Sequence, residues 1–385
     1  MSEYQYYEFQ AIDRPLTAEE MEHLRGYSTR AQITPTSFVN EYNWGDFKGD
    51  EDAWMERYFD AFLYFANWGT RTLKLRLPAR LLDPAVARPY CEGGSITIRP
   101  KGGNVILTYL HECDDGGEGE DICADSGWMA QIVPVRAELA RGDLRALYLG
   151  WLLGAQDGAL SDGDSEPSVP AGLGQLSASV QSLADFLRLD PDLLHVAAEA
   201  SPAREERPLR RDELQVWLAT LPASEKDDLL ARLIAEVDPA LPNELHRRFL
   251  RARDAARPEA APPAKRRTVS DLLRAAEVRR AERQRLAAEK AAAAKARTER
   301  EAALARVKHL DRLVGQEAEL WANVEDLVAT RLPKNYEAAV SLLVDLRDLA
   351  VRANEASGFR ARLDTLRSAC ARKTGLLDRL TKASL

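Results

Sequence analysis

Four possible ligands of a soft metal ion lie in one part of the chain. His111 and Cys113 are two residues apart, so they would share one face of a strand, and Cys91 and Cys123 flank them. Imidazole and thiolate are common ligands of zinc. Zinc sites usually contain cysteines two to four residues apart, however, and no two cysteines of this chain are that close. We therefore expect buried thiols and no metal.

Carboxylates offer two further chemistries. Residues 114–121 are rich in Asp and Glu, but they lack the alternating ligand order and the closing Glu of a calcium loop. Asp60 stands in a run of aromatic residues, where loss of solvent makes a carboxylate an acid–base candidate. No histidine stands at helical spacing beside it, so we expect a structural ion pair with Arg71 or Arg76. The sequence thus predicts no catalytic residue and no cofactor.

The residues Trp44, Asp46, Phe47 and Lys48 form the best candidate contact surface in the first 155 residues. Aromatic side chains beside charged ones are typical anchors of binding interfaces. Packing of the same aromatic residues in a core is an equal alternative.

A second candidate surface is the cationic run Lys265, Arg266 and Arg267, which follows a Pro-rich stretch. Residues 251–312 hold 18 Lys and Arg against 9 Asp and Glu, whereas residues 1–200 hold 16 against 32. This asymmetry fits a nucleic-acid or acidic partner, contact with the acidic part of the same chain, or a solvated spacer helix. Ala-rich helices of mixed charge are mostly spacers, so we favour the spacer.

Residues 1–155 are expected to form one domain that positions the aromatic loop. Strand-like stretches fall at 4–12, 33–42, 73–77, 95–99 and 104–110, the last two joined as a hairpin. Thr17 and Glu20 form a capping box at the start of a short helix. Residues 51–67 carry apolar side chains on two faces at helical spacing, which predicts a central buried helix. The fold class is α+β with a mostly antiparallel sheet.

The remainder is expected to be all-α. We expect a polar linker at 156–170, a small helical bundle at 171–255, a Pro-rich basic hinge at 256–267, a long exposed helix at 268–315 and a C-terminal helical hairpin domain at 316–385. Thr268 and Asp271 would cap the long helix. Only alanine fills the middle of that helix, so no sustained coiled-coil seam is predicted there.

Composition gives further expectations about location. No apolar run is long enough to cross a bilayer, and the four cysteines form no disulfide framework. The first residues lack a signal-peptide pattern. We therefore expect a cytoplasmic protein with no membrane partner.

Several stretches of sequence carry a resemblance to other proteins. They are residues 4–16, 33–38, 44–49, 141–151 and 336–350. In these stretches, and along nearly its whole length, the chain resembles a group of uncharacterised bacterial proteins. The resemblance implies a bacterial, cytosolic protein, and it implies no function and no active residue.

Together these observations favour a non-enzymatic scaffold or adaptor in a bacterial multiprotein system. It would contact protein partners through the aromatic loop and the long helix. A nucleic-acid-associated protein that uses the basic arm is the first alternative, and an enzyme that uses the N-terminal domain is the second. Salt-dependent retention on DNA would favour the first alternative, and a bound metal or small molecule the second.

Overall fold

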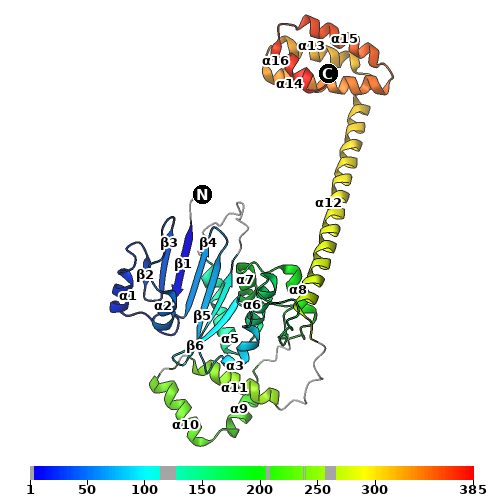
Figure 1. Cartoon of the computed structure of the whole chain (residues 1–385). Helices are drawn as coiled ribbons and strands as arrows, with labels where there is room; N and C mark the ends of the chain where they lie inside the picture. Colours follow the sequence, from blue (N-terminus) through cyan, green and yellow to red (C-terminus); the bar gives the residue numbers. More distant parts are fainter. Residues whose placement is uncertain (1–3, 113–126, 205–208, 237, 239, 256–265) are drawn as a thin grey trace. The chain divides into compact units, whose positions relative to one another are not determined.

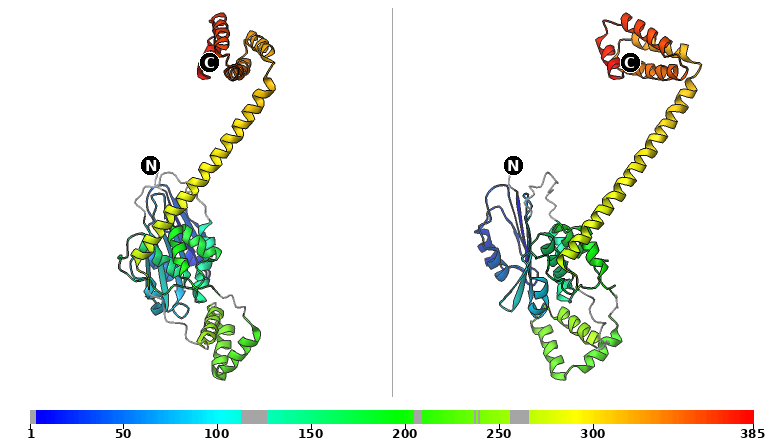
Figure 2. Two further views of the ribbon diagram at one scale, coloured as in Figure 1. Left: turned by 90° about the vertical axis from the view of Figure 1, so that its right-hand side faces the viewer. Right: turned by 45° about the vertical axis from the view of Figure 1, so that its right-hand side comes forward.

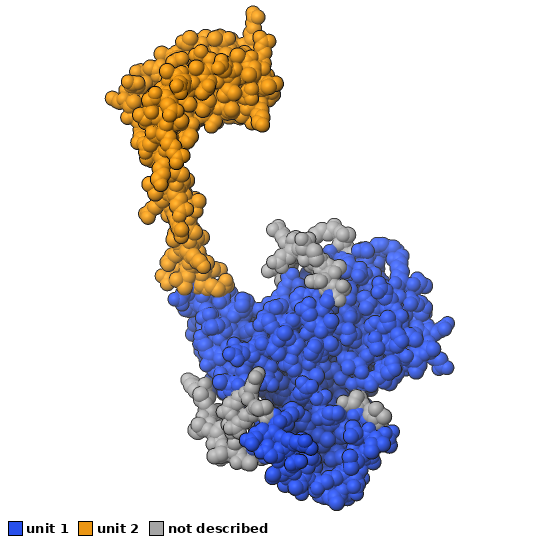
Figure 3. Space-filling view, turned by 180° about the vertical axis from the view of Figure 1, so that it is seen from behind, with its two compact units in different colours: residues 1–282 blue, residues 283–385 orange. Residues whose placement is uncertain are grey.

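The computed structural model describes residues 4–112, 127–204, 209–236, 238, 240–255 and 266–385. The chain forms two compact units, residues 1–282 and residues 283–385 (Figure 3). The long helix α12, Val269–Leu313, begins in the first unit and ends in the second. Residues 113–126, which include the acidic run, and residues 256–265, which include Lys265, are among those outside the described ranges.

The first unit is built on a seven-stranded antiparallel sheet with the order β2-β3-β1-β4-β5-β7-β6 (Figure 1). Its strands are β1 Gln5–Gln10, β2 Gln32–Thr34, β3 Ser37–Tyr42, β4 Ala61–Ala66, β5 Arg71–Pro78, β6 Ile96–Lys101 and β7 Asn104–His111. The predicted hairpin is confirmed, with β6 and β7 paired from Ile96 opposite Tyr109 to Lys101 opposite Asn104. Gly102 and Gly103 make its turn at φ 57° and 80°, backbone angles that favour glycine.

Helices cover both faces of this sheet (Figure 2). The first unit contains α1 Ala18–Arg25, α2 Glu51–Arg57, α3 Pro84–Ala87, η1 Arg88–Tyr90, α4 Trp128–Ile132, α5 Pro134–Ala140, α6 Arg145–Gln156, α7 Ala178–Phe186, α8 Pro191–Glu199, α9 Arg211–Thr220, α10 Ala223–Ala231, η2 Arg232–Glu236 and α11 Leu241–Ala255. The capping boxes predicted for α1 and α12 are both present. The α+β class with a following helical region is confirmed.

The prediction of one helix over residues 51–67 is wrong. The helix α2 ends at Arg57, and the aromatic run that follows forms strand β4 in the middle of the sheet. Successive side chains of a strand point to opposite faces. Phe62 enters the core beneath α1 and α2, and Leu63 enters the core on the other face. A strand that is buried on both faces is apolar throughout, so its sequence also satisfies a helical pattern.

The core on the α1–α2 face is largely aromatic. Phe9 lies at its centre, with its ring centroid 4.4 Å from that of Phe62 and 5.2 Å from that of Trp54. On the other face α6 packs closely on β6 and β7. A Cβ atom at Gly150 would lie 2.7 Å from Cδ1 of Ile96, so this contact requires glycine. The first turns of α12 join the same core through Val269 and Leu272.

The helices in the region predicted as one bundle, 171–255, do not all pack together: α7 and α8 join the core of the sheet, whereas α9 and α10 contain no buried residue. Helices α7 and α8 pack in the core of the sheet, where Phe186 and Leu193 are buried, instead of forming a separate bundle. The segment predicted as a linker, residues 156–170, also lies against the rest of the unit. Tyr90 donates its hydroxyl hydrogen bond to the carbonyl of Ser168 at 2.8 Å, and Ser165 forms a β-bridge with Thr268.

The second unit contains the end of α12 and four more helices. They are α13 Glu317–Ala329, α14 Pro333–Arg352, α15 Ala356–Ala369 and α16 Thr374–Lys382. Trp321, Leu343 and Phe359 contribute to their shared core. These helices lie within residues 316–385, which the sequence predicts as a helical hairpin domain. Within the described ranges, every helix falls short of the length or the apolar character that a bilayer crossing needs.

Asp60 makes the ion pair that the sequence predicts, with Arg76 as its partner. The carboxylate is 0% exposed and lies 2.7 Å from Nη2 of Arg76. It also accepts the backbone N–H groups of Ile12 and Asp13 at 2.7 and 2.9 Å. Burial alone would raise the pKa of Asp60, but the charges of Arg76 and Arg136 and these N–H groups hold it below its usual value.

We predict that Asp60→Asn lowers the free energy of unfolding by about 3–5 kcal/mol, because it leaves Arg76 without its buried counter-charge. Asp52→Asn is the matched control. Asp52 pairs with Lys74 at 2.8 Å but is half exposed, so we expect a loss of about 1 kcal/mol or less. Urea unfolding at pH 7 measures both. Equal losses in the two variants would contradict this account of Asp60.

The same pair predicts a pH dependence. The ionised Asp60 stabilises the fold above its unfolded-state pKa of about 3.9, and this contribution is lost as the pH falls through the lower folded-state pKa. Wild-type stability should therefore fall more steeply below about pH 4 than that of Asp60→Asn. Parallel pH profiles would count against the assignment.

Candidate functional site

The structure describes only part of the predicted metal group. Cys113, Cys123 and the acidic residues 114–121 lie outside the described residues. His111, at the end of β7, is buried, and its Nδ1 lies 3.0 Å from Oδ2 of Asp157. Burial raises the pKa of the Cys91 thiol to about 12, which keeps it protonated. Among the described residues, no three His, Cys, Asp or Glu side chains come together as metal ligands.

The structure separates the four residues predicted as an aromatic contact surface. Phe47 turns inward, with its ring centroid 4.8 Å from that of Trp54. Trp44 is 68% exposed, and the guanidinium carbon of Arg30 lies 5.1 Å from its ring centroid. Asp46 and Lys48 are exposed. Thus Phe47 belongs to the core, while Trp44, Asp46 and Lys48 remain available to a partner.

The cationic run is also divided. Lys265 lies outside the described residues, and Arg266 is exposed. The guanidinium group of Arg267 donates to both carboxylate oxygens of Glu166, at 2.7 and 2.8 Å. Glu166 is 3% exposed and also accepts the hydroxyl hydrogen of Tyr148. Arg267 therefore stabilises the fold from inside, and its guanidinium is not presented to a partner.

The long helix α12 carries charges of both signs. Its sequence contains twelve Lys and Arg and seven Asp and Glu. Ion pairs engage the cations Arg279, Arg280, Arg285, Lys295, Arg297 and Arg306. Residues 281–305 are all exposed. At least half of the cations in α12 are thus already paired with acids of the same chain, which weakens the case for a nucleic-acid surface.

A surface that the sequence does not reveal lies on α9, α10, η2 and α11. Helix α9 has apolar residues at helical spacing, Leu214, Trp217, Leu218 and Leu221. In a helix that packs in a core, such a face is buried. Yet neither α9 nor α10 contains a single buried residue. The large exposed apolar side chains of this region are Leu209, Val216, Leu218, Leu230, Leu233 and Ile234.

These helices form a groove, which we call the α9–α11 groove. It has a volume of about 540 Å³ and is lined by Asp212, Glu213, Val216, Trp217, Thr220, Phe249, Ala252 and Arg253. The rings of Trp217 and Phe249 meet edge to face, with centroids 5.7 Å apart. The guanidinium carbon of Arg253 lies 5.8 Å from the centroid of Phe249. Trp217 and Phe249 therefore link α9 to α11, while Val216, 70% exposed, points to solvent.

Acidic side chains border the groove on the α9 side. Asp212 and Glu213 line it, and Asp227 and Asp228 are exposed on the neighbouring α10. An apolar groove with charges at its edge is the type of surface that receives an amphipathic helix. The spacing of apolar residues in α9 could be read from the sequence. Their exposure could not, because it depends on which distant segments pack against them.

Three comparisons with known proteins found nothing similar: no family model matches the chain, no curated protein matches it and no solved structure matches it.

The internal role of Arg267 leads to a prediction. Arg267→Gln leaves Glu166 buried without its cation, so we expect the free energy of unfolding to fall by about 3–5 kcal/mol. Arg266→Gln removes the same charge from an exposed neighbour and should change stability by about 0.5 kcal/mol or less. Urea denaturation of the two variants measures the difference. If Arg266→Gln destabilises the chain as much as Arg267→Gln, the ion pair with Glu166 does not have this role.

Proposed function

We propose that the protein is a non-enzymatic adaptor that holds an amphipathic helix of a protein partner in the α9–α11 groove. The observation that carries this proposal is the exposure of α9 and α10, two helices with apolar residues and no buried one. The sequence resemblance implies a bacterial, cytosolic protein, and we infer a multiprotein system as the setting.

The energetics favour a covered groove. An isolated helix of about 10 residues is marginal in water, and most helical stability in proteins comes from packing an apolar face. Full burial of one Val or Leu side chain contributes about 1.5–3 kcal/mol. A partner that covered Val216 and Leu218 would therefore stabilise both itself and α9.

Charge restricts the chemistry of the partner. Asp212 lines the groove but pairs with Arg210 at 2.8 Å, whereas Glu213 forms no ion pair with another described residue. A helix with Lys or Arg beside its apolar stripe would therefore be attracted to Glu213. An acidic helix of the same shape would be repelled. Specificity in this adaptor would then come from the acidic edge, and affinity from the apolar floor.

Two other surfaces support an adaptor that contacts more than one partner. Trp44, stacked with Arg30, is a large exposed aromatic side chain beside charges, the kind of residue that anchors interfaces. The exposed stretch 281–305 of α12 is the other. The basic-arm alternative predicts salt-dependent retention on DNA, so such retention by the full chain would favour it over the adaptor.

A designed peptide tests the groove directly. The probe is a labelled helix of about 18 residues, with Leu at positions i, i+3, i+4 and i+7 and Lys on both sides of that stripe. We expect it to bind the full chain in fluorescence anisotropy. Val216→Asp should weaken binding by about tenfold or more, because it places a charge in the apolar contact.

The matched control is Val278→Asp on α12. Val278 is 67% exposed, close to the 70% of Val216, and the substitution has the same intrinsic cost in a helix. It should leave the affinity unchanged. A second peptide with Glu in place of Lys should bind more weakly. Equal binding to wild type and Val216→Asp, or failure of the Lys peptide to bind, would reject the groove as the site.

A further inference from the structure

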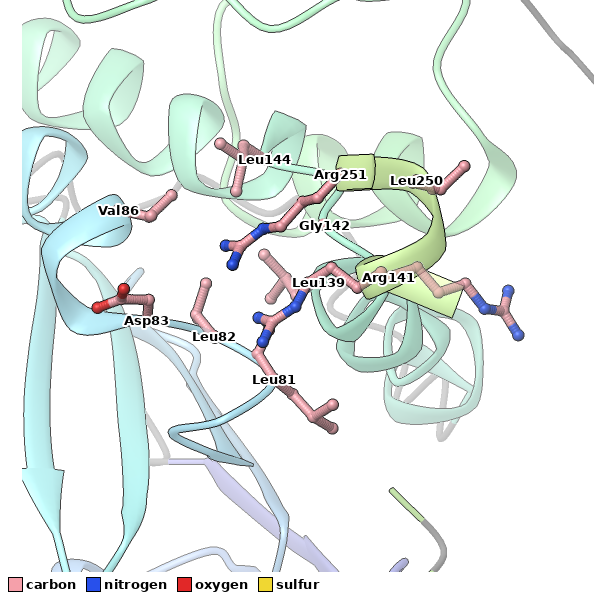
Figure 4. A pocket seen from close by; sticks show the side chains of 11 residues that line it. Leu81, Leu82, Asp83, Val86, Leu139, Arg141, Gly142, Leu144, Leu250 and Arg251 are labelled. Carbon is pink, nitrogen blue, oxygen red and sulfur yellow. The ribbon is translucent and has the colours of Figure 1, made fainter. Parts of the chain in front are cut away.

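A second cavity lies where α11 meets α3 and the turn between α5 and α6 (Figure 4). The α11 residues that line it differ from those that line the α9–α11 groove. Its volume is about 250 Å³. Pockets for drug-sized ligands occupy about 300–1,000 Å³, so this cavity suits a smaller molecule. It is lined by Leu81, Leu82, Asp83, Val86, Leu139, Arg141, Gly142, Leu144, Arg247, Leu250 and Arg251.

The walls of this cavity combine aliphatic surface with positive charge. Six of its residues are Leu or Val, and three are Arg. Figure 4 shows the side chain of Arg251 reaching from α11 toward Val86 and Leu82. The one acidic lining residue, Asp83, caps α3 by accepting the N–H of Ala85 at 2.9 Å. The lining therefore has an excess of positive charge.

The three arginines have only distant counter-charges, since Glu244 and Asp83 act on Arg247 without forming an ion pair with it. Among the described residues, no carboxylate lies within ion-pair distance of Arg141, Arg247 or Arg251. Arg141 donates from Nε to the amide oxygen of Asn243 at 3.3 Å, and Arg247 donates to the carbonyl of Leu81. These neutral acceptors leave the charges unbalanced.

Of the three arginines, Arg247 has a buried nitrogen atom, Nε, without a hydrogen-bond partner among the described residues. Burial, followed by the positive charge of Arg251, lowers the pKa of Arg247, and the carboxylates of Glu244 and Asp83 oppose this shift only in part. A buried donor without an acceptor costs free energy, and so does a pair of like charges. An anion in the cavity would offset both costs.

We propose that this cavity binds a small amphipathic anion, a carboxylate or a phosphate carried by a short aliphatic group. The anionic end would accept hydrogen bonds from Arg247 and Arg251, since a guanidinium group matches carboxylate and phosphate oxygens in shape and charge. The aliphatic group would lie against the leucines. The cavity shares no lining residue with the α9–α11 groove.

Such a ligand would strengthen the contact between α11 and the sheet. That contact already has a polar link, because Arg80 lies 2.7 Å from Asp238 and 3.3 Å from Glu244, at the start of α11. The cavity contains residues from both sides of the contact, so one bound anion would touch α3, the α5–α6 turn and α11 together.

Isothermal titration calorimetry with the full chain tests the proposal. The probes are hexyl phosphate, hexanoate, inorganic phosphate and hexylamine. We expect one molecule of hexyl phosphate or hexanoate to bind per chain, and no binding of hexylamine. Arg251→Gln should weaken the anion by about tenfold or more. Arg251 is exposed and forms no ion pair with a described residue, so this variant should fold normally.

Three further arms make the test decisive. Arg247→Gln should weaken binding as Arg251→Gln does, whereas Arg211→Gln, an exposed arginine on α9 outside the cavity, should not. Inorganic phosphate should bind more weakly than hexyl phosphate, because it leaves the leucines uncovered. Equal affinity for these two phosphates would overturn the amphipathic ligand. Unchanged affinity in both cavity variants, or no binding of either aliphatic anion at millimolar concentration, would overturn the site.

Discussion

Burial of both faces of the seven-stranded sheet is the constraint on which the rest of the first unit depends. One face is covered by α1 and α2 with an aromatic core around Phe9, and the other by α4 to α8 and the first turns of α12. Asp60 is buried directly before the central strand β4, where a carboxylate is tolerated only with partners such as Arg76 and two backbone N–H groups. The tight packing of α6 at Gly150 follows from the same constraint.

Some charged side chains of this protein form ion pairs within the fold, and others do not. We assign a structural role to the paired ones and a binding role to the cavity arginines. Arg267 and Glu166 satisfy each other inside the fold, and ion pairs along α12 engage many of its cations. Arg247 and Arg251 face a cavity with no such partner among the described residues. The net charge of a segment is therefore a poor guide to where an anion binds. A better guide is whether each cationic side chain already has an ion-pair partner.

Local patterns in the sequence predicted much of the fold. Turn residues marked the β6–β7 hairpin, and the pairs Thr17 with Glu20 and Thr268 with Asp271 marked two helix starts. The failure at residues 51–67 has a physical cause, since an all-apolar strand and a helix buried on two faces share one pattern. The groove and the cavity were not predictable, because each is made by residues far apart in the chain, such as Leu81 with Arg247.

The central claim is that α9 and α10 present an apolar surface that a partner covers. Amide hydrogen exchange followed by mass spectrometry on the full chain tests it most directly, since exchange reports local opening and helices without buried residues open readily. We expect residues 211–231 to exchange much faster than α6 in the chain alone, and to become protected when the Lys-flanked helical peptide is added. Protection of residues 211–231 equal to that of α6 without any peptide, or no change on its addition, would contradict the account.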